Sequence, residues 1–457
     1  MRRFVGPLTV SALVAWQPAT PLAQTMYTAP VELSPTATIS GQNAFTILSL
    51  PPGDWFAAGF YQDYMGGTAL DLMVSSSSVA VDLSGLSSSM PGTMQGIYQF
   101  NSNTSPGSQP GQISTNISNS TIGLTVEPSA MLTGNYSVTG VYMETDGGNG
   151  TSSTPGADAG SIGFNLSNST ITVNATVAGQ GAAVGVLAQG GAGGTGQEKL
   201  AGGHGGAAGV ITGALSDVTL YSTGQGVGGL VVNQIGGAGG NGLANEQLSS
   251  GGAGANAPGM YVLFSSSGRG SSIMTSGDNA PGIAMLARGG DGGIGSEHDG
   301  ELSLNETGSY GGNGGSVLSI ADPTGAANSI SLRSCTPNLS CTGALSITTT
   351  GQNAYGIQLA ATAGNGGNSG TISAMGDLSP GIPGVGGTTG AVSLELFPNT
   401  TIKTTGAGAS AILGQAQGGV GGTSGGSIRT VATPAQRRAA RAATAAMSGS
   451  TSTTRSA

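Results

Sequence analysis

The chain has 457 residues with 86 glycines, a net charge of −9 and only 7% Asp, Glu, Lys or Arg, against usual shares of about 7% glycine and about 25% charged residues. The 37% of apolar residues is too high for a disordered chain. The charged residues are too few to solvate the outer faces of helices. The negative net charge argues against nucleic acid as the main partner. The composition therefore predicts an all-β protein whose surface is solvated by hydroxyl and amide side chains.

Residues 1–23 have the residue order of a secretory signal peptide. Arg2 and Arg3 precede an apolar stretch at 4–16, and small residues lead to a cleavage site expected near Ala23. The apolar stretch is shorter than the roughly 20 residues that a membrane-spanning helix needs. We therefore expect an exported protein, and we expect no later segment to cross a membrane as a helix.

The section 24–139 is unusually aromatic. Eleven of the chain's twenty aromatic residues lie between Tyr27 and Tyr142, including those of the segment DWFAAGFYQDYMGG at 54–67. The aromatic residues of that segment are Trp55, Phe56, Phe60, Tyr61 and Tyr64. Terminal repeats of a stacked structure need a cap over their core, so we interpret 24–139 as an N-terminal cap or irregular β section. An aromatic surface that stacks on carbohydrate is the alternative.

Between 140 and 430 the sequence repeats a small residue followed by an aliphatic one. The six pairs are Gly140-Val141, Gly185-Val186, Gly229-Leu230, Gly282-Ile283, Gly356-Ile357 and Ala411-Ile412, at spacings of 45, 44, 53, 74 and 55 residues. Another glycine stands five or six residues earlier, at Gly134, Gly179, Gly224, Gly277, Gly351 and Gly406. Aliphatic residues then alternate with the period of two that is typical of strands. Each unit is predicted as strand, glycine turn, strand and glycine-rich loop.

Such a unit cannot bury its apolar face alone and must stack on its neighbours. A parallel β-helix, or β-solenoid, accommodates short strands at irregular spacing, because extra residues become loops on one face. Glycine-rich segments such as AQGGAGGTG at 188–196 and AQGGVGGTSGG at 416–426 are then expected to be loops that carry no core.

The signal peptide, the repeated strand pair and the A-x-G-G-x-G-G segment that follows it resemble the passenger region of autotransporter (type V secreted) proteins, which are surface proteins of Gram-negative bacteria. The resemblance covers about residues 130–430. It implies a right-handed parallel β-helix and passage across the outer membrane through a C-terminal β-barrel.

The C-terminal end departs from that family. After Ser427 the pattern stops, and four of the twelve basic residues lie between Arg437 and Arg455, without the alternating strands of a barrel. We expect 431–457 to be a disordered tail, and the outer membrane to be a partner only if a barrel is supplied elsewhere. The expected location is the cell surface, the outer membrane or the medium, or the periplasm if the chain is truncated.

Cys335 and Cys341 are the only cysteines, in the segment SCTPNLSCTG. In an oxidising compartment a close pair indicates a disulfide that closes a small loop. Two thiolates without a neighbouring histidine supply only half of a zinc shell. We therefore predict a disulfide and assign no metal.

Motifs of known catalytic sites occur in the sequence without their usual context. The GxGxxG pattern at 191–196 is followed by no helix pattern. Ser424 lies in a GxSxG pattern, but both histidines, His204 and His298, precede it, against the order of a hydrolase triad. The segment GGAGANAPG at 251–259 is an imperfect calcium nonapeptide. We assign no catalytic, cofactor-binding or metal-binding residue.

Acidic residues such as Asp146, Asp217, Asp291 and Asp377 are scattered, and we expect no two acids of 140–430 to lie close together on one strand. The leading hypothesis is an exported structural protein, in the adhesin class, that presents loops from a β-helical rod to host or surface glycans or to copies of itself. The alternative is a β-helical lyase or hydrolase acting on polysaccharides. A third class, a glycine-rich or ice-contacting surface protein, would need flat rows of threonine.

Overall fold

The computed structural model describes residues 24–429 with internal gaps. The gaps are 48–55, 84–91, 104, 106–110, 128–135, 177–178, 198–199, 244–248, 267, 300–305, 323–324, 335–342, 375–377 and 397–398. The expected signal peptide (1–23), the expected tail (431–457), the predicted Cys335–Cys341 disulfide and Trp55 lie outside the described residues.

The described chain is all-β and contains no helix, as predicted, and it forms long parallel sheets. In spatial order, the first sheet contains β28 (Val392–Glu395), β23 (Ile330–Ser334), β16 (Met260–Ser265), β13 (Ile211–Ser216), β10 (Ile162–Ser167), β7 (Ile113–Ser118), β5 (Leu70–Asp82), β8 (Thr121–Val126), β11 (Thr170–Ala175), β14 (Thr219–Thr223), β17 (Ser271–Ser276), β24 (Leu345–Thr350) and β29 (Thr400–Thr405), with β3 (Thr36–Thr46) beside β5 and β1 (Thr25–Tyr27) beside β3. The second sheet contains β2 (Val31–Glu32), β4 (Phe56–Met65), β6 (Thr93–Asn103), β9 (Tyr136–Gly147), β12 (Gly179–Gln189), β15 (Val227–Ile235), β18 (Ile283–Arg288), β25 (Ile357–Thr362) and β30 (Ile412–Gln417).

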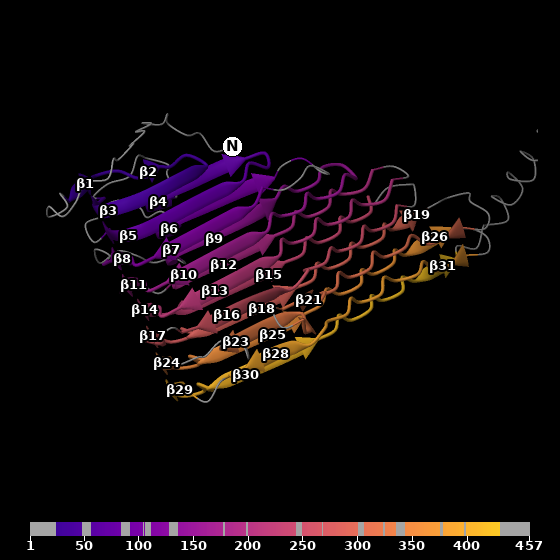
Figure 1. Ribbon diagram of the computed structural model, residues 1–457. Coiled ribbons are helices and arrows are strands. Elements are labelled where there is room, and N and C mark those ends of the chain that lie inside the picture. Colours follow the sequence, from indigo (N-terminus) through magenta and orange to yellow (C-terminus); the bar gives the residue numbers. More distant parts are fainter. Residues whose placement is uncertain are drawn as a thin grey trace, which may run out of the picture.

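Each repeat contributes one strand to each half of the first sheet and one strand to the second sheet, as β10, β11 and β12 do. Neighbouring strands in a sheet come from successive repeats, so the colours in Figure 1 change steadily from indigo to yellow across the body. β5 is long enough to pair with both β7 and β8. The first sheet turns at this corner, where Ser76, Asn119, Asn168 and Asp217 all have positive φ, between 47 and 53°. Asn, Asp and Ser tolerate this left-handed backbone through local hydrogen bonds.

Inward side chains of successive repeats stack in columns. Ile113, Ile162, Ile211, Met260 and Ile330 are aligned by the strand register and are all buried. Full burial of one such side chain contributes roughly 1.5–3 kcal/mol. The period-two pattern in the sequence is therefore the alternation between this core and solvent.

The outer face of the first sheet carries hydroxyl groups, as the composition predicts. One column in register consists of Ser78, Thr121, Thr170, Thr219, Ser272, Ser346 and Thr401. These side chains are exposed or half-buried, so neutral hydroxyls solvate this face in place of charges.

The predicted small–aliphatic pairs align across the second sheet with one exception. Val141 pairs with Val184, which pairs with Leu230, so Ala183-Val184 takes the place that the sequence assigned to Gly185-Val186. The small residue is needed because a Cβ at Gly140 would lie 2.7 Å from the carbonyl oxygen of Ala183. Gly185 has another role, since a Cβ there would lie 2.8 Å from the Tyr142 ring.

The section 24–139 does not form a separate unit. β4 and β6 continue the second sheet into β9, and β5 continues the first sheet into β7 and β8. The expected boundary at 139 therefore coincides with no break in either sheet.

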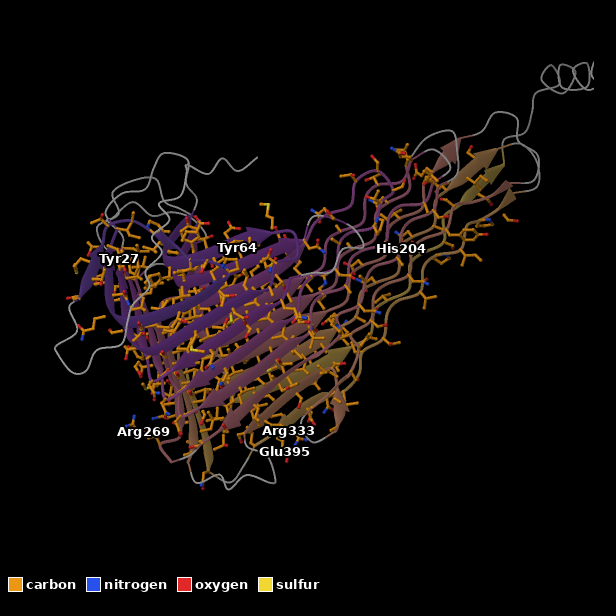
Figure 2. The ribbon with its side chains drawn as sticks, turned by 45° about the horizontal axis from the view of Figure 1, so that its top comes forward. Tyr27, Tyr64, His204, Arg269, Arg333 and Glu395 are labelled. Atoms are coloured by element: carbon orange, nitrogen blue, oxygen red, sulfur yellow. The ribbon has the colours of Figure 1, made fainter. Side chains whose placement is uncertain are left out.

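Part of the aromatic segment packs at the N-terminal end of the core. Phe60 packs edge-to-face on Phe45 with ring centroids 4.8 Å apart, and Tyr27 stacks on Phe45 at 4.6 Å. The Tyr64 hydroxyl donates to the Leu33 carbonyl at 2.9 Å. Figure 2 shows Tyr27 and Tyr64 at this end of the body. Tyr61, in contrast, lies outside the core, against Tyr98 and Phe100.

Candidate functional site: a glycine arm

The glycine-rich segments form an arm that projects from one side of the body, where Figure 1 draws them as parallel wavy ribbons. Outgoing segments leave the second sheet, and returning segments lead back to the first sheet. The outgoing segments are 148–152, 190–196, 236–242, 289–295, 363–369 and 418–425, and the returning segments are 154–160, 202–209, 250–257, 311–317 and 382–390. The tip bears β19 (His298–Asp299), β26 (Ile372–Ala374) and β31 (Ser427–Arg429), with β20 (Glu306–Thr307) paired to β27 (Leu378–Ser379).

These segments connect strands, as expected of loops, but they are more ordered than the sequence indicates, because their backbones are hydrogen-bonded to one another with a period of three residues. Gly190 and Gly193 donate to the carbonyls of Ile235 and Ala238 in the next outgoing segment, at 2.9 and 2.8 Å. Gly191 donates to Ala157 of a returning segment at 2.9 Å. A period of three is that of the polyproline II helix, which makes no internal hydrogen bonds. Neighbouring segments therefore supply the partners that water supplies elsewhere.

Glycine is required because the two layers of the arm touch through their backbones. A Cβ at Gly193 of an outgoing segment would lie 1.9 Å from the Gly203 carbonyl oxygen of a returning segment, and one at Gly205 would lie 1.9 Å from that of Gly237. In each glycine–glycine–x triplet the two glycines lie inside the arm, and the third residue, here called the outer position, faces solvent. The interior is thus filled with peptide groups instead of side chains.

Side chains at many outer positions accept a hydrogen bond from a backbone N–H of the next repeat. We call this arrangement the side-chain clamp. The Asn365 Oδ1 accepts the Val420 N–H at 2.9 Å, and the Val420 carbonyl accepts the N–H of Gly366 at 2.8 Å. The side chain of one residue and the N–H of the following residue thereby pair with the N–H and the carbonyl of a single residue in the next repeat. The clamp residues are Asn149, Asp158, His204, Asn241, Ser250, Asn256, Asp291, Asn313, Ser316, Asn365 and Asn368.

The last segments of the arm carry aliphatic residues at outer positions. Ile382 is 64% exposed, Val385 68% and Val420 66%. Ile382 and Val385 lie on the face of the returning segments, and Val420 lies on the opposite face. The arm therefore offers solvent two faces of amide, hydroxyl and aliphatic side chains in fixed rows.

Buried polar side chains of the second sheet fix the arm to the body. The Gln234 Nε2 donates to the carbonyls of Gly209 and Gly259 at 2.6 and 2.9 Å, and its Oε1 accepts the Gly259 N–H at 3.0 Å. In the same column the Thr145 hydroxyl donates to the Gly160 carbonyl at 2.7 Å. These contacts lie where returning segments re-enter the first sheet, so they set the arm's register.

The three motifs that lack their usual sequence context, GxGxxG, GxSxG and the imperfect calcium nonapeptide, all lie in the arm. The GxGxxG glycines at 191–196 are interior positions, and Ser424 lies in the last outgoing segment. Asn256, which with Pro258 breaks the calcium pattern, is a clamp residue whose side chain accepts the Ser316 N–H at 2.7 Å. The Nδ1 of His204 accepts the Ala253 N–H at 3.1 Å, and Figure 2 shows His204 on the arm.

The expectation of scattered acids is wrong on β9, where Glu144 and Asp146 are two residues apart and lie on the same face. The sequence reading considered Asp146 but overlooked Glu144. Both are half-buried beside Tyr142, whose ring stacks on Tyr98 with centroids 5.9 Å apart. Burial, followed by the charges of Glu144 and Asp146, raises the Tyr142 pKa above its ordinary value. Tyr142 therefore stays a neutral hydroxyl.

The other acids that the sequence singled out have structural partners. The Asp217 Oδ1 accepts the Ser266 hydroxyl at 2.6 Å, and Asp291 is a clamp residue that also pairs with Arg288 at 2.6 Å. Asp377 lies outside the described residues.

A charged group near the C-terminal end of the body was missed in the sequence. Arg333 on β23 contacts Asp322 at 2.8 Å and Glu395 on β28 at 2.9 Å. Asp322 is fully buried beside the short antiparallel pair of β21 (Ile320–Ala321) and β22 (Ala327–Asn328). Figure 2 shows Arg333 and Glu395 together at this end. Arg333 and Glu395 are far apart in sequence and come together only when the repeats stack, so the sequence alone does not show that they are partners.

Three further observations bear on the class of protein. Within the described ranges, no three His, Cys, Asp or Glu residues are grouped so that they could hold a metal ion. The same ranges contain no helical segment of the length and hydrophobicity that crossing a bilayer requires. No protein-family model matches the chain, and comparisons with curated proteins and with solved structures return no match.

Proposed function

We propose that this chain is an exported structural protein of the autotransporter-passenger type, which adheres through its glycine arm. In this proposal the body is a right-handed parallel β-helix. Support comes from the order of strands, since each repeat adds one strand to each of three stacked rows, as stacked repeats do.

The observation that carries the adhesive function is the exposure of the outer positions. Ile382, Val385 and Val420 are each more than 60% exposed, on a thin arm away from the body. Contiguous exposed apolar residues with a polar rim mark surfaces that bind partners, and Ile382 and Val385 occupy successive outer positions of one returning segment. Neutral amides and hydroxyls between them suit contacts with glycans or with other copies of the chain.

The test is adhesion of the purified full chain to plates coated with neutral glycans, and its self-association in solution. We expect the double variant Ile382→Asp/Val385→Asp to lose most binding, because it places charges on the arm's contact face. Met73→Asp is the matched control, since Met73 is 49% exposed on the body. Equal binding by both variants and the unmodified chain would refute adhesion through the arm.

Export is tested separately by determining the N-terminus of the protein made in a Gram-negative host. A mature chain that begins at Gln24 is expected, because the signal peptide is proposed to be cut after Ala23. Recovery of only the full-length chain from the cytoplasm would contradict export.

A polysaccharide-acting enzyme is the second candidate, and the pair Glu144 and Asp146 favours it. Two half-buried carboxylates on one strand, next to stacked Tyr98 and Tyr142, are the groups that glycoside hydrolysis uses as acid and base or nucleophile. Release of reducing ends from polysaccharides by the full chain, abolished in Glu144→Gln and Asp146→Asn, would establish this function.

A further inference from the structure

The arm contains a set of sites that are prone to chemical modification. Where glycine follows asparagine, the glycine nitrogen can attack the asparagine Cγ with loss of ammonia, and solvent water then opens the succinimide to aspartate or isoaspartate. The chain has four such steps, at Asn149-Gly150, Asn241-Gly242, Asn313-Gly314 and Asn365-Gly366. All four asparagines are clamp residues.

In each step, one residue of the next repeat holds both reacting groups. At Asn241 the side-chain Oδ1 accepts the Ile294 N–H at 2.9 Å, and the Gly242 N–H donates to the Ile294 carbonyl at 2.7 Å. At Asn365 the corresponding distances, both to Val420, are 2.9 and 2.8 Å.

The other two steps have the same geometry. Ala192 holds Asn149 and Gly150 at 2.8 and 2.7 Å, and Val385 holds Asn313 and Gly314 at 2.9 and 2.8 Å.

We propose that these four asparagines are latent deamidation sites, which the stacking of the arm protects. Ring closure needs the glycine nitrogen to give up its proton and the asparagine side chain to turn back toward its own backbone. Both movements require the next segment to detach first. Deamidation is therefore coupled to local opening of the arm, and isoaspartate, which lengthens the backbone, would prevent the triplets from stacking again.

Val420→Pro provides a local test with Val420→Ala as its control. Val420 is 66% exposed, so either side chain fits, and the fixed φ of proline suits a polyproline II segment. Proline removes the N–H that Asn365 accepts and places its Cδ there, which displaces the Asn365 side chain, whereas alanine retains the N–H. The full chains are incubated at mildly alkaline pH, and deamidation at each asparagine is followed by peptide mass spectrometry, with the chain unfolded in guanidinium as reference.

The proposal predicts deamidation at least about ten-fold slower in the folded chain at all four steps, and acceleration at Asn365 alone in Val420→Pro. Equal rates in folded and unfolded chains would overturn it. So would equal rates at Asn365 in the proline and alanine variants. Equal acceleration of all four steps by proline would refute local protection by the clamp, because Val420 contacts Asn365 and lies several repeats away from Asn149.

Discussion

Replacing one interior glycine of the arm should be far more damaging than changing the residue next to it. Gly237 donates to the Gly206 carbonyl at 2.9 Å, and its own carbonyl accepts the Ala255 N–H at 2.9 Å. A Cβ on Gly237 would lie 2.0 Å from the Gly191 oxygen. Ala238 follows directly but is exposed at an outer position. Each substitution, Gly237→Ala and Ala238→Ser, adds one heavy atom. Comparing them therefore distinguishes the effect of an interior backbone contact from the effect of a larger side chain.

The cost of Gly237→Ala follows from the separation that it forces. A normal contact of the new Cβ requires the two segments to move apart by more than 1 Å, from the 2.0 Å at which Cβ and oxygen would otherwise meet. Such a shift breaks or weakens two or three backbone hydrogen bonds, each with a net value of about 1 kcal/mol. We expect a local destabilisation of about 3 kcal/mol for Gly237→Ala, and less than about 0.5 kcal/mol for Ala238→Ser.

Hydrogen exchange followed by mass spectrometry measures this local opening directly. A loss of about 3 kcal/mol corresponds to roughly a 100-fold loss of protection in peptides that cover 190–196 and 236–242. Peptides from β10 and β11 in the body serve as internal controls and should be unchanged. Equal protection of the arm in the two variants would refute the reasoning that close backbone contact selects glycine.

Three other changes test separate parts of the structure. Asn256→Ala should destabilise the arm by about 1 kcal/mol in hydrogen exchange, because the Ser316 N–H loses its partner, whereas Asn256→Asp, which retains an acceptor, should not. Arg333→Ala should lower the free energy of unfolding in guanidinium by about 3 kcal/mol, because Asp322 is left as a buried charge; an unchanged midpoint would contradict this. The raised Tyr142 pKa means that above about pH 10 only the unfolded chain loses this proton, so the free energy of unfolding should fall with rising pH by about 1.4 kcal/mol per unit. Tyr142→Phe should reduce that slope, and an unchanged slope would exclude the contribution.

The strands of the body could be predicted from sequence because they follow a local rule. A strand such as β10 alternates buried Ile162, Phe164 and Leu166 with solvent-facing residues, and this alternation is visible in any window of six residues. The turn glycines were also predictable. Gly277 and Gly351 have φ of 148 and 141°, and their even placement before each strand pair marks them as turns.

The arm was not predicted because its order comes from neighbours that are distant in sequence. The partners of Gly190 and Asn365, for example, lie 45 and 55 residues further along the chain. A glycine run alone has the same composition whether it is a loop or a stacked segment. The useful signal was the triplet period, with Asn or Asp recurring at the third position, as in GGNGG. For the same reason Arg333 and Glu395 could not be recognised as partners.

This arrangement also explains how the proposed adhesive surface can vary while the fold stays fixed. In each triplet the two interior glycines are constrained by backbone contacts of about 2 Å, as at Gly206 and Gly237. The outer position is constrained only where its side chain is a clamp. Ala238 and Val420 are exposed and hold no further segment among the described residues. Substitutions at such positions can change the surface of the arm without disturbing the hydrogen bonds that order it, whereas a body strand exposes only the residues that its core does not require. The arm is therefore the part of this chain where the outer side chains can change at the least cost in stability, as a variable adhesive surface of the proposed kind requires.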